Sequence, residues 1–352
     1  MKILNKIPQY TRNKRHIQSI ITHGNAFKLW NIVRVEIERK MRRIKTSGRP
    51  YLLILDPCNY CNLKCPLCPT GTSSLNREQC VMTFDEFKKI FDKFSDYLLE
   101  VNLHNWGEPF INKDIFKMVD YAQKKNVGTN LSSNFVIPKS SDIDNIIDSG
   151  LEYLIVSLDA VTPEVYDKYR VHGDFNRVIE NLSLLLKRRR EKKCRTPIVE
   201  WQFIVMKTNE HQVKEAEAMA SKLGVDIMRF IPVGLPFDDP DKKNLAAKWF
   251  PGGKTIDSQD DSVKIGQYGQ TIRSEPCYYL YRSITIHPDG GIAPCCIVYD
   301  KKYDAGMIWG TSLDEIWNNE YYRSARSLFS GNDFKLLKST PCRKCNIFKK
   351  YK

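Results

Sequence analysis

Four of the chain's 11 cysteines lie between positions 58 and 68, in the segment CNYCNLKCPLC. Thiols this close together have three common uses: a disulfide, a zinc site or an iron–sulfur cluster. The pairs Cys58/Cys61 and Cys65/Cys68 would supply the four ligands of a closed zinc site. Cys61, Cys65 and Cys68 alone would hold a 4Fe-4S cluster and leave one iron open for a small molecule. The spacing by itself leaves both metals open.

The N-terminal segment does not read as a secretory signal, because neither a continuous apolar stretch nor a small-residue cleavage site follows its cationic start. No apolar run approaches the ~18 residues that span a membrane. We therefore expect a cytoplasmic protein without a transmembrane segment. Thiols stay reduced in the cytoplasm, which favours metal ligands or catalytic groups over disulfides.

Short apolar runs alternate with helical patterns between Tyr51 and Ile231. Thr83 and Glu86 form a capping box at the start of one helix, and Pro163 fits the first turn of another. Six β-α units in succession predict an α/β fold with a parallel sheet, closed or partly closed into a barrel. Active sites of such sheets lie at the carboxyl ends of the strands. The predicted strands cover 51–55, 100–106, 127–132, 153–159, 199–205 and 226–231.

The spacing CxxxCxxC after the first strand resembles the signature of the radical SAM superfamily, and CNLKCPLC matches its common form closely. The resemblance implies that Cys61, Cys65 and Cys68 bind a 4Fe-4S cluster whose open iron chelates S-adenosylmethionine (SAM). One electron from the cluster would split the sulfonium and give a 5′-deoxyadenosyl radical. Cys58 would be a bystander or a further thiol of the ligand region. The family's fold is a partial (β/α)6 TIM-like barrel.

Two later loops resemble SAM-binding loops of the same family. WGEPF after the second strand is similar to the loop that holds the SAM amino group, which implies roles for Gly107, Glu108 and Pro109. Glycine lets a backbone approach a ligand closely, and a carboxylate suits an ammonium. The third strand ends in SSN, where Ser133 and Asn134 would bond the ribose hydroxyls or form an ordinary polar turn.

The fourth strand ends in VSLDA, which also resembles a family sequence and implies SAM contacts from Ser157 and Arg170. A guanidinium can hold the methionine carboxylate with two hydrogen bonds. Asp159 either joins these contacts or caps the next helix. Because these loops follow successive strands in order, they support the iron interpretation, whereas a zinc knuckle predicts nothing about them.

A second set of cysteines lies near the C-terminus. Cys277 is followed by twelve residues, Gly290, four residues and Cys295, and Cys342-x2-Cys345 completes the set. This pattern resembles the SPASM/Twitch-type extension of radical SAM enzymes, and it implies four ligands for one auxiliary 4Fe-4S cluster. A zinc ribbon is the alternative. Cys296 is left over as a second-choice ligand, an inert thiol or a hydrogen-atom donor.

Four segments are expected: a basic helical extension at 1–49, the barrel at 50–231, a linker or loop at 232–276, and a small cluster-binding domain at 277–352. In the last segment, SITIHPDGGIAPCC predicts a hairpin, followed by one helix from about 313 to 329.

The N-terminal 50 residues have a net charge of +11, out of +14 for the whole chain. Apolar residues recur there at Trp30, Val33, Ile37, Met41 and Ile44, with Arg and Lys between them, which predicts a basic amphipathic helix from 26 to 44. The helix either packs on the body with its charges solvated or docks on an anionic surface. Membrane headgroups, nucleic acid and an acidic substrate are the three candidate surfaces.

The expected activity is reductive cleavage of SAM and hydrogen-atom abstraction from a polar substrate such as a sugar, a sugar nucleotide or an aminocyclitol. Dehydrogenation or epimerisation would follow, which makes the protein an oxidoreductase or epimerase. A peptide maturase, including the sulfatase-maturing type, and an RNA-modifying enzyme are the alternatives, and a zinc scaffold without activity is the least favoured. A flavodoxin or ferredoxin would donate the electron.

Overall fold

One eight-stranded sheet forms the centre of the computed structural model, which describes residues 8–253, 275–330, 340–345 and 348. The order is β6-β5-β4-β3-β2-β1-β7-β8, and β1 to β6 are parallel. The predicted partial (β/α)6 barrel is therefore confirmed. The strands are β1 Leu52–Leu55, β2 Glu100–Asn102, β3 Gly128–Ser133, β4 Tyr153–Ser157, β5 Ile198–Val205, β6 Ile227–Pro232, β7 Ser283–Ile286 and β8 Ile292–Ala293.

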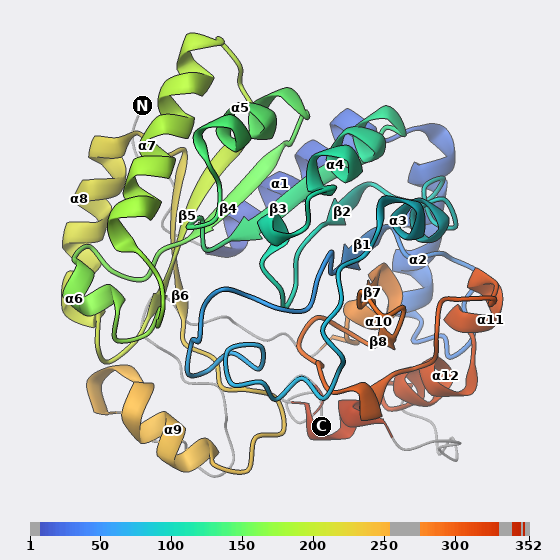
Figure 1. The fold of residues 1–352 in the computed structure, drawn as a ribbon. Coiled ribbons are helices and arrows are strands. Elements are labelled where there is room, and N and C mark those ends of the chain that lie inside the picture. The colour runs from blue at the N-terminus through green and yellow to red at the C-terminus, as the bar shows by residue number, and fades with distance from the viewer. Residues whose placement is uncertain (1–7, 254–274, 331–339, 346–347, 349–352) are drawn as a thin grey trace.

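The connecting helices follow the outside of the curved sheet (Figure 1). The predicted capping box of Thr83 and Glu86 is present at the start of α3, and Pro163 occupies the first turn of α6. The helices of the barrel are α3 Phe84–Phe91, α4 Ile115–Lys124, α5 Ser140–Asp148, α6 Pro163–Tyr166, α7 Phe175–Glu191 and α8 Val213–Leu223.

Strand alternation separates an apolar outer face from a polar inner one. On β1 and β4, Leu53, Leu55 and Leu154 are fully buried against the helices. The opposite face of the sheet carries polar residues, including Asn102, Asn130 and others described below. Because side chains alternate along a strand, this division predicts that the inside of the barrel can receive a polar ligand.

The C-terminal hairpin is part of the same sheet, because β7 pairs in parallel with β1 and antiparallel with β8. The predicted single helix over 313–329 is wrong. It consists of α11 Leu313–Trp317 and α12 Glu320–Ser327. The break has a local cause, since the Asn319 side chain accepts the backbone N–H of Tyr322 and so caps a new helix. A short α10, Tyr279–Arg282, precedes β7.

Two further elements differ from expectation. The stretch expected to be a linker contains α9, Lys242–Trp249, whose Trp249 is buried beside Leu67 and Tyr169, while residues 254–274 lie outside the described part of the chain. The second strand ends at Asn102 instead of Trp106. Beyond it the backbone N–H groups of Trp106 and Gly107 donate to the Asp56 carboxylate, which turns the chain out of the ladder.

The N-terminal extension forms α1, Pro8–His23, and α2, Ala26–Lys40. On α1, Arg15 pairs with Glu100, and His23 contacts Glu152 at 2.7 Å. Both acidic residues lie at the N-terminal ends of strands, so α1 crosses the end of the barrel opposite to the cysteine loop. In the described part of the chain, none of the helices has the length and apolar character needed to cross a bilayer.

Candidate active site

The loop between β1 and α3 carries the first cysteine cluster at the carboxyl end of the sheet. Cys61, Cys65 and Cys68 belong to one packed group with Leu63 and Leu67. Cys58 is turned away from them, because its fully buried thiol donates to the Glu108 carbonyl oxygen at 3.1 Å. The geometry thus separates the three thiols of the CxxxCxxC spacing from the fourth.

Two N–H groups point at the Cys61 sulfur: the backbone N–H of Leu63 at 3.4 Å and the Asn134 side-chain amide at 3.5 Å. Burial raises the pKa of the Cys61 thiol to about 12 and that of Cys65 to about 11. Donors aimed at sulfur stabilise a thiolate and tune the potential of a cluster. This chemistry fits cluster ligation, which would release the thiol protons.

Gly107 allows the loop after β2 to lie against the cysteine loop. A Cβ atom at this position would stand 2.0 Å from the Cys58 carbonyl oxygen, so no larger residue fits. The close approach that the glycine permits is therefore to the neighbouring backbone. Thr70 reinforces this contact, since its hydroxyl donates to the Trp106 carbonyl oxygen at 2.6 Å.

Glu108 joins the loops after β2 and β3. Its buried carboxylate accepts hydrogen bonds from the Ser133 hydroxyl at 2.7 Å and the Asn134 backbone N–H at 2.8 Å, and Pro109 begins a short 3-10 helix behind it. Asn134 also donates to the Asn62 side chain at 2.9 Å. Glu108, Ser133 and Asn134 thus bond one another and the cysteine loop.

Arg170 lies between the fourth strand and the cysteine loop. Its Nε donates to Asp159 at 2.6 Å, and the other Asp159 oxygen accepts the backbone N–H of Ile204 at 2.6 Å. Asp159 caps no helix, because Thr162 occupies the N-cap of α6. The guanidinium also lies against the Cys65 thiol. A fixed cation at this point could bind the carboxylate of a ligand on the cluster.

The inside of the barrel is lined with hydrogen-bonding groups. Ser157 on β4 faces Ser132 on β3, with 3.5 Å between their hydroxyl oxygens. The Asn130 side-chain N–H donates to the Asn102 side chain at 2.8 Å. The side-chain oxygen of Asn130 is buried and has no hydrogen-bond partner among the described residues. Deeper in, Arg229 donates to Glu200 and Gln202. An unpaired buried acceptor indicates room for a polar ligand.

Three residues near the site were missed by the sequence interpretation. Asp56 directly follows β1, and burial raises its pKa to about 7. His104 follows β2, and burial lowers its pKa to about 4, so it is neutral at physiological pH. Ser132 precedes the two residues that were chosen. Asp56 and His104 could have been found by the rule that polar residues at strand ends build the site. Ser132 could have been found from the alternation of side chains along a strand.

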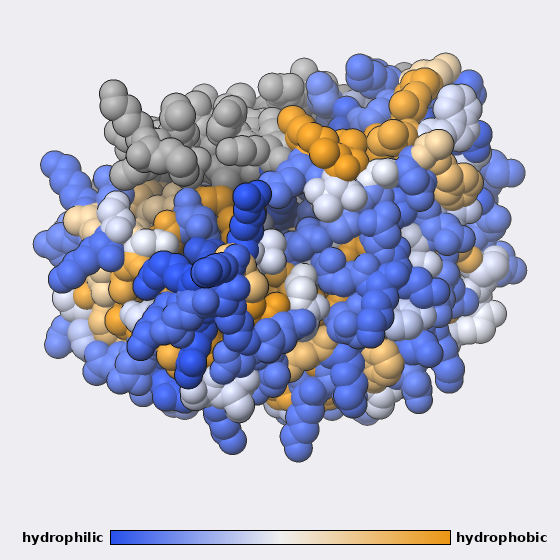
Figure 2. All heavy atoms as spheres, turned by 90° about the horizontal axis from the view of Figure 1, so that it is seen from above, coloured by the Kyte–Doolittle hydropathy of each residue, from blue (hydrophilic) through white to orange (hydrophobic). Residues whose placement is uncertain are grey.

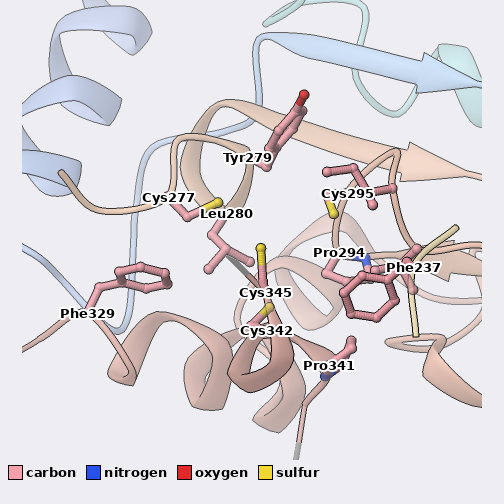
Figure 3. Close-up of a pocket in the computed structure, with 12 residues that line it drawn as sticks. Phe237, Cys277, Tyr279, Leu280, Pro294, Cys295, Phe329, Pro341, Cys342 and Cys345 are labelled. Atoms are coloured by element: carbon pink, nitrogen blue, oxygen red, sulfur yellow. The ribbon is translucent and has the colours of Figure 1, made fainter. Parts of the chain in front are cut away.

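The second set of cysteines lines one pocket in the C-terminal unit. Cys277, Cys295, Cys342 and Cys345 come from three separate segments, and Figure 3 shows their side chains turned toward the same space. The rest of the lining is mostly apolar, and burial raises the pKa of Cys277 to about 12. Phe237, Leu280, Pro294, Ile297, Val298, Phe329 and Pro341 are the apolar lining residues.

Cys296 does not line this pocket. Its thiol donates to the Tyr279 hydroxyl at 3.5 Å, and it is partly exposed. Among the described residues, no three His, Cys, Asp or Glu side chains are arranged as ligands of a single metal ion. The four pocket thiols and the three loop thiols are nevertheless chemically suited to iron–sulfur clusters, since both groups are cysteine-only and are buried or partly buried.

Arg77 connects the two cysteine regions. It lies in the loop after Cys68, and its side chain is 1% exposed. Its guanidinium donates to Asp289 and Asp304, both at 3.0 Å, and to the Tyr299 carbonyl oxygen at 2.9 Å. The buried guanidinium of Arg77 therefore holds the first cysteine loop against the hairpin of the C-terminal unit through several hydrogen bonds.

Two family models match the chain. Residues 55–200 match the radical SAM superfamily, and residues 277–346 match an iron-sulfur cluster-binding domain of the SPASM type. Together they cover the cysteine loop, strands β2 to β4 and the four pocket cysteines. The two matches imply a SAM-binding 4Fe-4S cluster, SAM itself and auxiliary cluster binding, in agreement with the cofactors expected from the sequence.

Several curated proteins are similar in sequence. The chain is 28% identical over 300 residues to the mycofactocin maturase MftC of Mycolicibacterium smegmatis, covering 79% of this chain and 72% of that protein. It is 27% identical to the PqqA peptide cyclase of Bradyrhizobium diazoefficiens over 38% of this chain and 34% of that one. For the AdoMet-dependent heme synthase of Methanosarcina barkeri the identity is 23%, over 54% of each. The chain thus spans about a third to a half of the length of the latter two relatives.

Solved structures share the fold. Streptococcus suis SuiB bound to the precursor peptide SuiA superposes with a TM-score of 0.61 at 16% identity, over 91% of this chain and 74% of that one. AnSMEcpe with bound AdoMet superposes with a TM-score of 0.57 at 14% identity, over 85% of this chain and 88% of that one. At these identities the likeness concerns the fold alone. On the two family models, the chain is an enzyme of the radical SAM superfamily with a C-terminal SPASM-type cluster-binding domain.

Proposed function

We propose that the protein is a radical SAM peptide maturase, which removes a hydrogen atom from a precursor peptide and oxidises the product with the help of an auxiliary cluster. The observation that carries this proposal is the match to a mycofactocin maturase over 79% of the chain. The relatives thus favour the peptide alternative over the sugar-type substrate that was first expected. Peptide oxidation replaces epimerisation as the reaction type.

Bound SAM and its cluster would supply a carbon radical that abstracts hydrogen. The protein itself binds and orients SAM and the substrate, and it excludes water from the site. Cys61, Cys65 and Cys68 are the proposed cluster ligands, and Asn134 donates to the first of them. Arg170, held by Asp159, is the proposed partner of the SAM carboxylate.

The loop residues divide into two groups in this proposal. Glu108, Ser133 and Asn134 support the cysteine loop from behind through their mutual hydrogen bonds, and Gly107 and Pro109 belong to the same loop, where Gly107 lies against the Cys58 backbone. Ser157, together with Ser132 opposite, faces the interior and is the proposed contact to the ribose or the substrate. The SAM ammonium would then be bound by backbone carbonyl oxygens of the loop after β2.

The C-terminal pocket is proposed to hold one auxiliary cluster through Cys277, Cys295, Cys342 and Cys345. With four protein ligands such a cluster would have no open iron for a substrate, and the chemistry that it would supply is electron transfer: it would take up one electron while the substrate radical loses a proton to water. Cys296 remains a candidate hydrogen-atom donor only for an epimerisation. A flavodoxin or ferredoxin is the proposed electron source, and a cytoplasmic location belongs to the same proposal.

The test is a reaction of the anaerobically purified, reconstituted protein with SAM, a reductant and candidate precursor peptides. A peptide product lighter by two hydrogen atoms, formed together with 5′-deoxyadenosine, would support the proposal. Sugar nucleotides and tRNA serve as competing substrates in parallel reactions. Turnover of either one with no change in any peptide would contradict it.

A further inference from the structure

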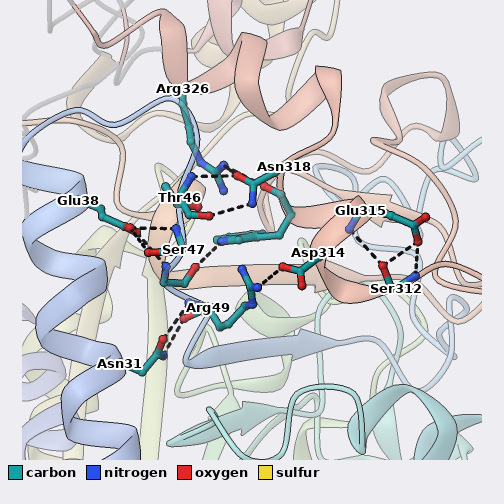
Figure 4. A network of polar contacts seen from close by, with 12 residues as sticks. Asn31, Glu38, Thr46, Ser47, Arg49, Ser312, Asp314, Glu315, Asn318 and Arg326 are labelled. Carbon is teal, nitrogen blue, oxygen red and sulfur yellow. Dashed lines mark hydrogen bonds and ion pairs between the residues drawn. The ribbon is translucent and has the colours of Figure 1, made fainter.

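Helix α2 packs on the protein with its polar side. Lys28, Asn31 and Arg39 are 3–6% exposed, and Val35 is the one apolar residue among the buried positions of the helix. Lys28 donates to the Asn126 carbonyl oxygen at 2.6 Å. Asn31 exchanges two hydrogen bonds with the Arg49 backbone, and Figure 4 shows this contact beside those of Glu38.

The apolar stripe that the sequence indicated therefore faces outward. The exposed fractions are 53% for Phe27, 60% for Trp30, 52% for Ile37 and 57% for Met41. Figure 2 shows a strip of hydrophobic atoms at one rim of the molecule, flanked by hydrophilic ones. An amphipathic helix normally buries its apolar side, so this reversal needs a partner that covers it. Leu29 and Val33 on α2, and Ile17 and Ile21 on α1, are also exposed.

The charges around the stripe are positive. Arg34, Lys40, Arg43 and Lys45 are exposed, and Arg34 lies over the Trp30 ring at 5.6 Å. The acidic residues of the helix point inward. Glu36 accepts hydrogen bonds from the Tyr51 hydroxyl at 2.8 Å and from Arg282, and Glu38 accepts the Ser47 hydroxyl at 2.7 Å. The outward face of α2 is thus apolar and cationic, and neither carboxylate of the helix itself lies beside the stripe.

We propose that α1 and α2 form a docking surface for an anionic lipid membrane, with the stripe in the headgroup–acyl boundary and the basic residues on lipid phosphates. Interfacial helices have this composition: Trp, Phe and aliphatic residues on one side, flanked by Lys and Arg. Each basic residue near such a surface adds to the electrostatic attraction.

The composition favours lipid over nucleic acid. Phosphate backbones are bound by Lys and Arg, but Ile37, Val33 and Met41 would find nothing apolar on a duplex to pack against. The position also suits a membrane, because α1 and α2 lie at the end of the barrel opposite to the cysteine loop. A protein docked by this face would keep the mouth of the barrel open to substrate. The inference does not depend on the proposed substrate.

The test is flotation of the full-length protein with vesicles of phosphatidylglycerol and phosphatidylcholine, and with phosphatidylcholine alone. The wild type is expected to float with the anionic vesicles only. The double variant Trp30→Glu/Ile37→Glu should lower the partition coefficient at least about tenfold, because it removes two large apolar anchors. The triple variant Lys40→Gln/Arg43→Gln/Lys45→Gln should weaken binding by a factor of ten or more, and added salt should do the same.

Matched controls keep the test specific. Met307→Glu changes a 40% exposed methionine outside the surface, and Lys117→Gln/Lys124→Gln/Lys187→Gln removes three exposed charges elsewhere. Both controls should float like the wild type. Every variant should still form 5′-deoxyadenosine from SAM in the absence of vesicles, which shows that it folds.

Three outcomes would overturn the proposal: no flotation of the wild type, equal flotation of the wild type and the Trp30→Glu/Ile37→Glu variant, or tighter binding to RNA than to anionic vesicles. A fourth is a dimer in sedimentation that this variant abolishes, since the stripe would then bind a second copy.

Discussion

The two cysteine regions differ in what surrounds the sulfur atoms. Around Cys61 and Cys65 lie hydrogen-bond donors and a buried cation, namely the Asn134 amide, the Leu63 N–H and Arg170. Around Cys277 and Cys342 lie leucine, proline and phenylalanine side chains. A polar surrounding suits a site that must accept and release a charged ligand, whereas an apolar one suits a closed site. The comparison therefore supports the proposal that SAM is cleaved at the first region, whereas the second serves electron transfer or stability.

The largest expected effect comes from removing one thiol in each region. Cys65→Ala should abolish 5′-deoxyadenosine formation, because the cluster that cleaves SAM would be lost. Cys342→Ala should keep SAM cleavage but stop product formation. Chromatography of both products checks this, with the exposed Cys194→Ser as the matched control. Equal loss of SAM cleavage in both variants would break the distinction between the regions.

The apolar lining offers the next largest effect. Leu280 is 1% exposed, so Leu280→Ala should lower the free energy of unfolding by about 2–5 kcal/mol. Denaturant titration measures this loss. Leu280→Met is the conservative control and should cost less than about 1.5 kcal/mol. If Leu280→Ala left the free energy of unfolding nearly unchanged, the pocket would not be a packed part of the fold.

Between acidic and neutral pH the polar region should give stability a pH dependence, whereas, of the described residues, no Asp, Glu or His side chain lines the C-terminal pocket. Burial raises the pKa of Asp56 from 3.8 to about 7, so the native state holds this proton longer than the unfolded state. Stability from Asp56 is then fully present below pH 3.8 and is lost as the pH rises through about 7. Melting temperatures between these values should fall less steeply in Asp56→Asn. An unchanged slope in this variant would contradict the assignment.

The smallest effect is expected from a single donor to sulfur. Asn134→Leu removes the 3.5 Å contact to Cys61 and should shift the potential of the first cluster to more negative values by some tens of millivolts. A redox titration followed by electron paramagnetic resonance can resolve the two clusters. The potential of the auxiliary cluster should stay unchanged, and a shift of both would show that the loss is not local.

Much of the fold could be predicted because its signals are local. Each of the six predicted strands is present, and Thr83 and Pro163 start helices as expected. The break between α11 and α12 was missed because Asn319 caps a helix inside an apolar pattern that continues across it. Helix α9 was missed because Pro, Gly and Asp surround it. In both places the residues on either side carried a stronger pattern than the helix cap or the short helix itself.

The candidate site divides in the same way. The residue types and spacing of Cys61, Cys65 and Cys68 identify a metal-binding loop without any structure, but the choice of iron over zinc rested on the resemblance to a family. The partners of Glu108 and Ser133 did not follow from the sequence. Their hydrogen bonds run between the loops after β2 and β3, which meet only when the sheet curves.

The sequence by itself determined the family, the alternation of strands and helices along the chain and the two sets of thiols, because motif spacing and hydrophobic period are properties of nearby residues. Only the tertiary structure decided which side of α2 is buried and how Arg77 fastens one cysteine region to the other. Burial and ion pairing join residues far apart in the chain, and a periodic pattern says that a helix has two sides without saying which one the rest of the protein will cover.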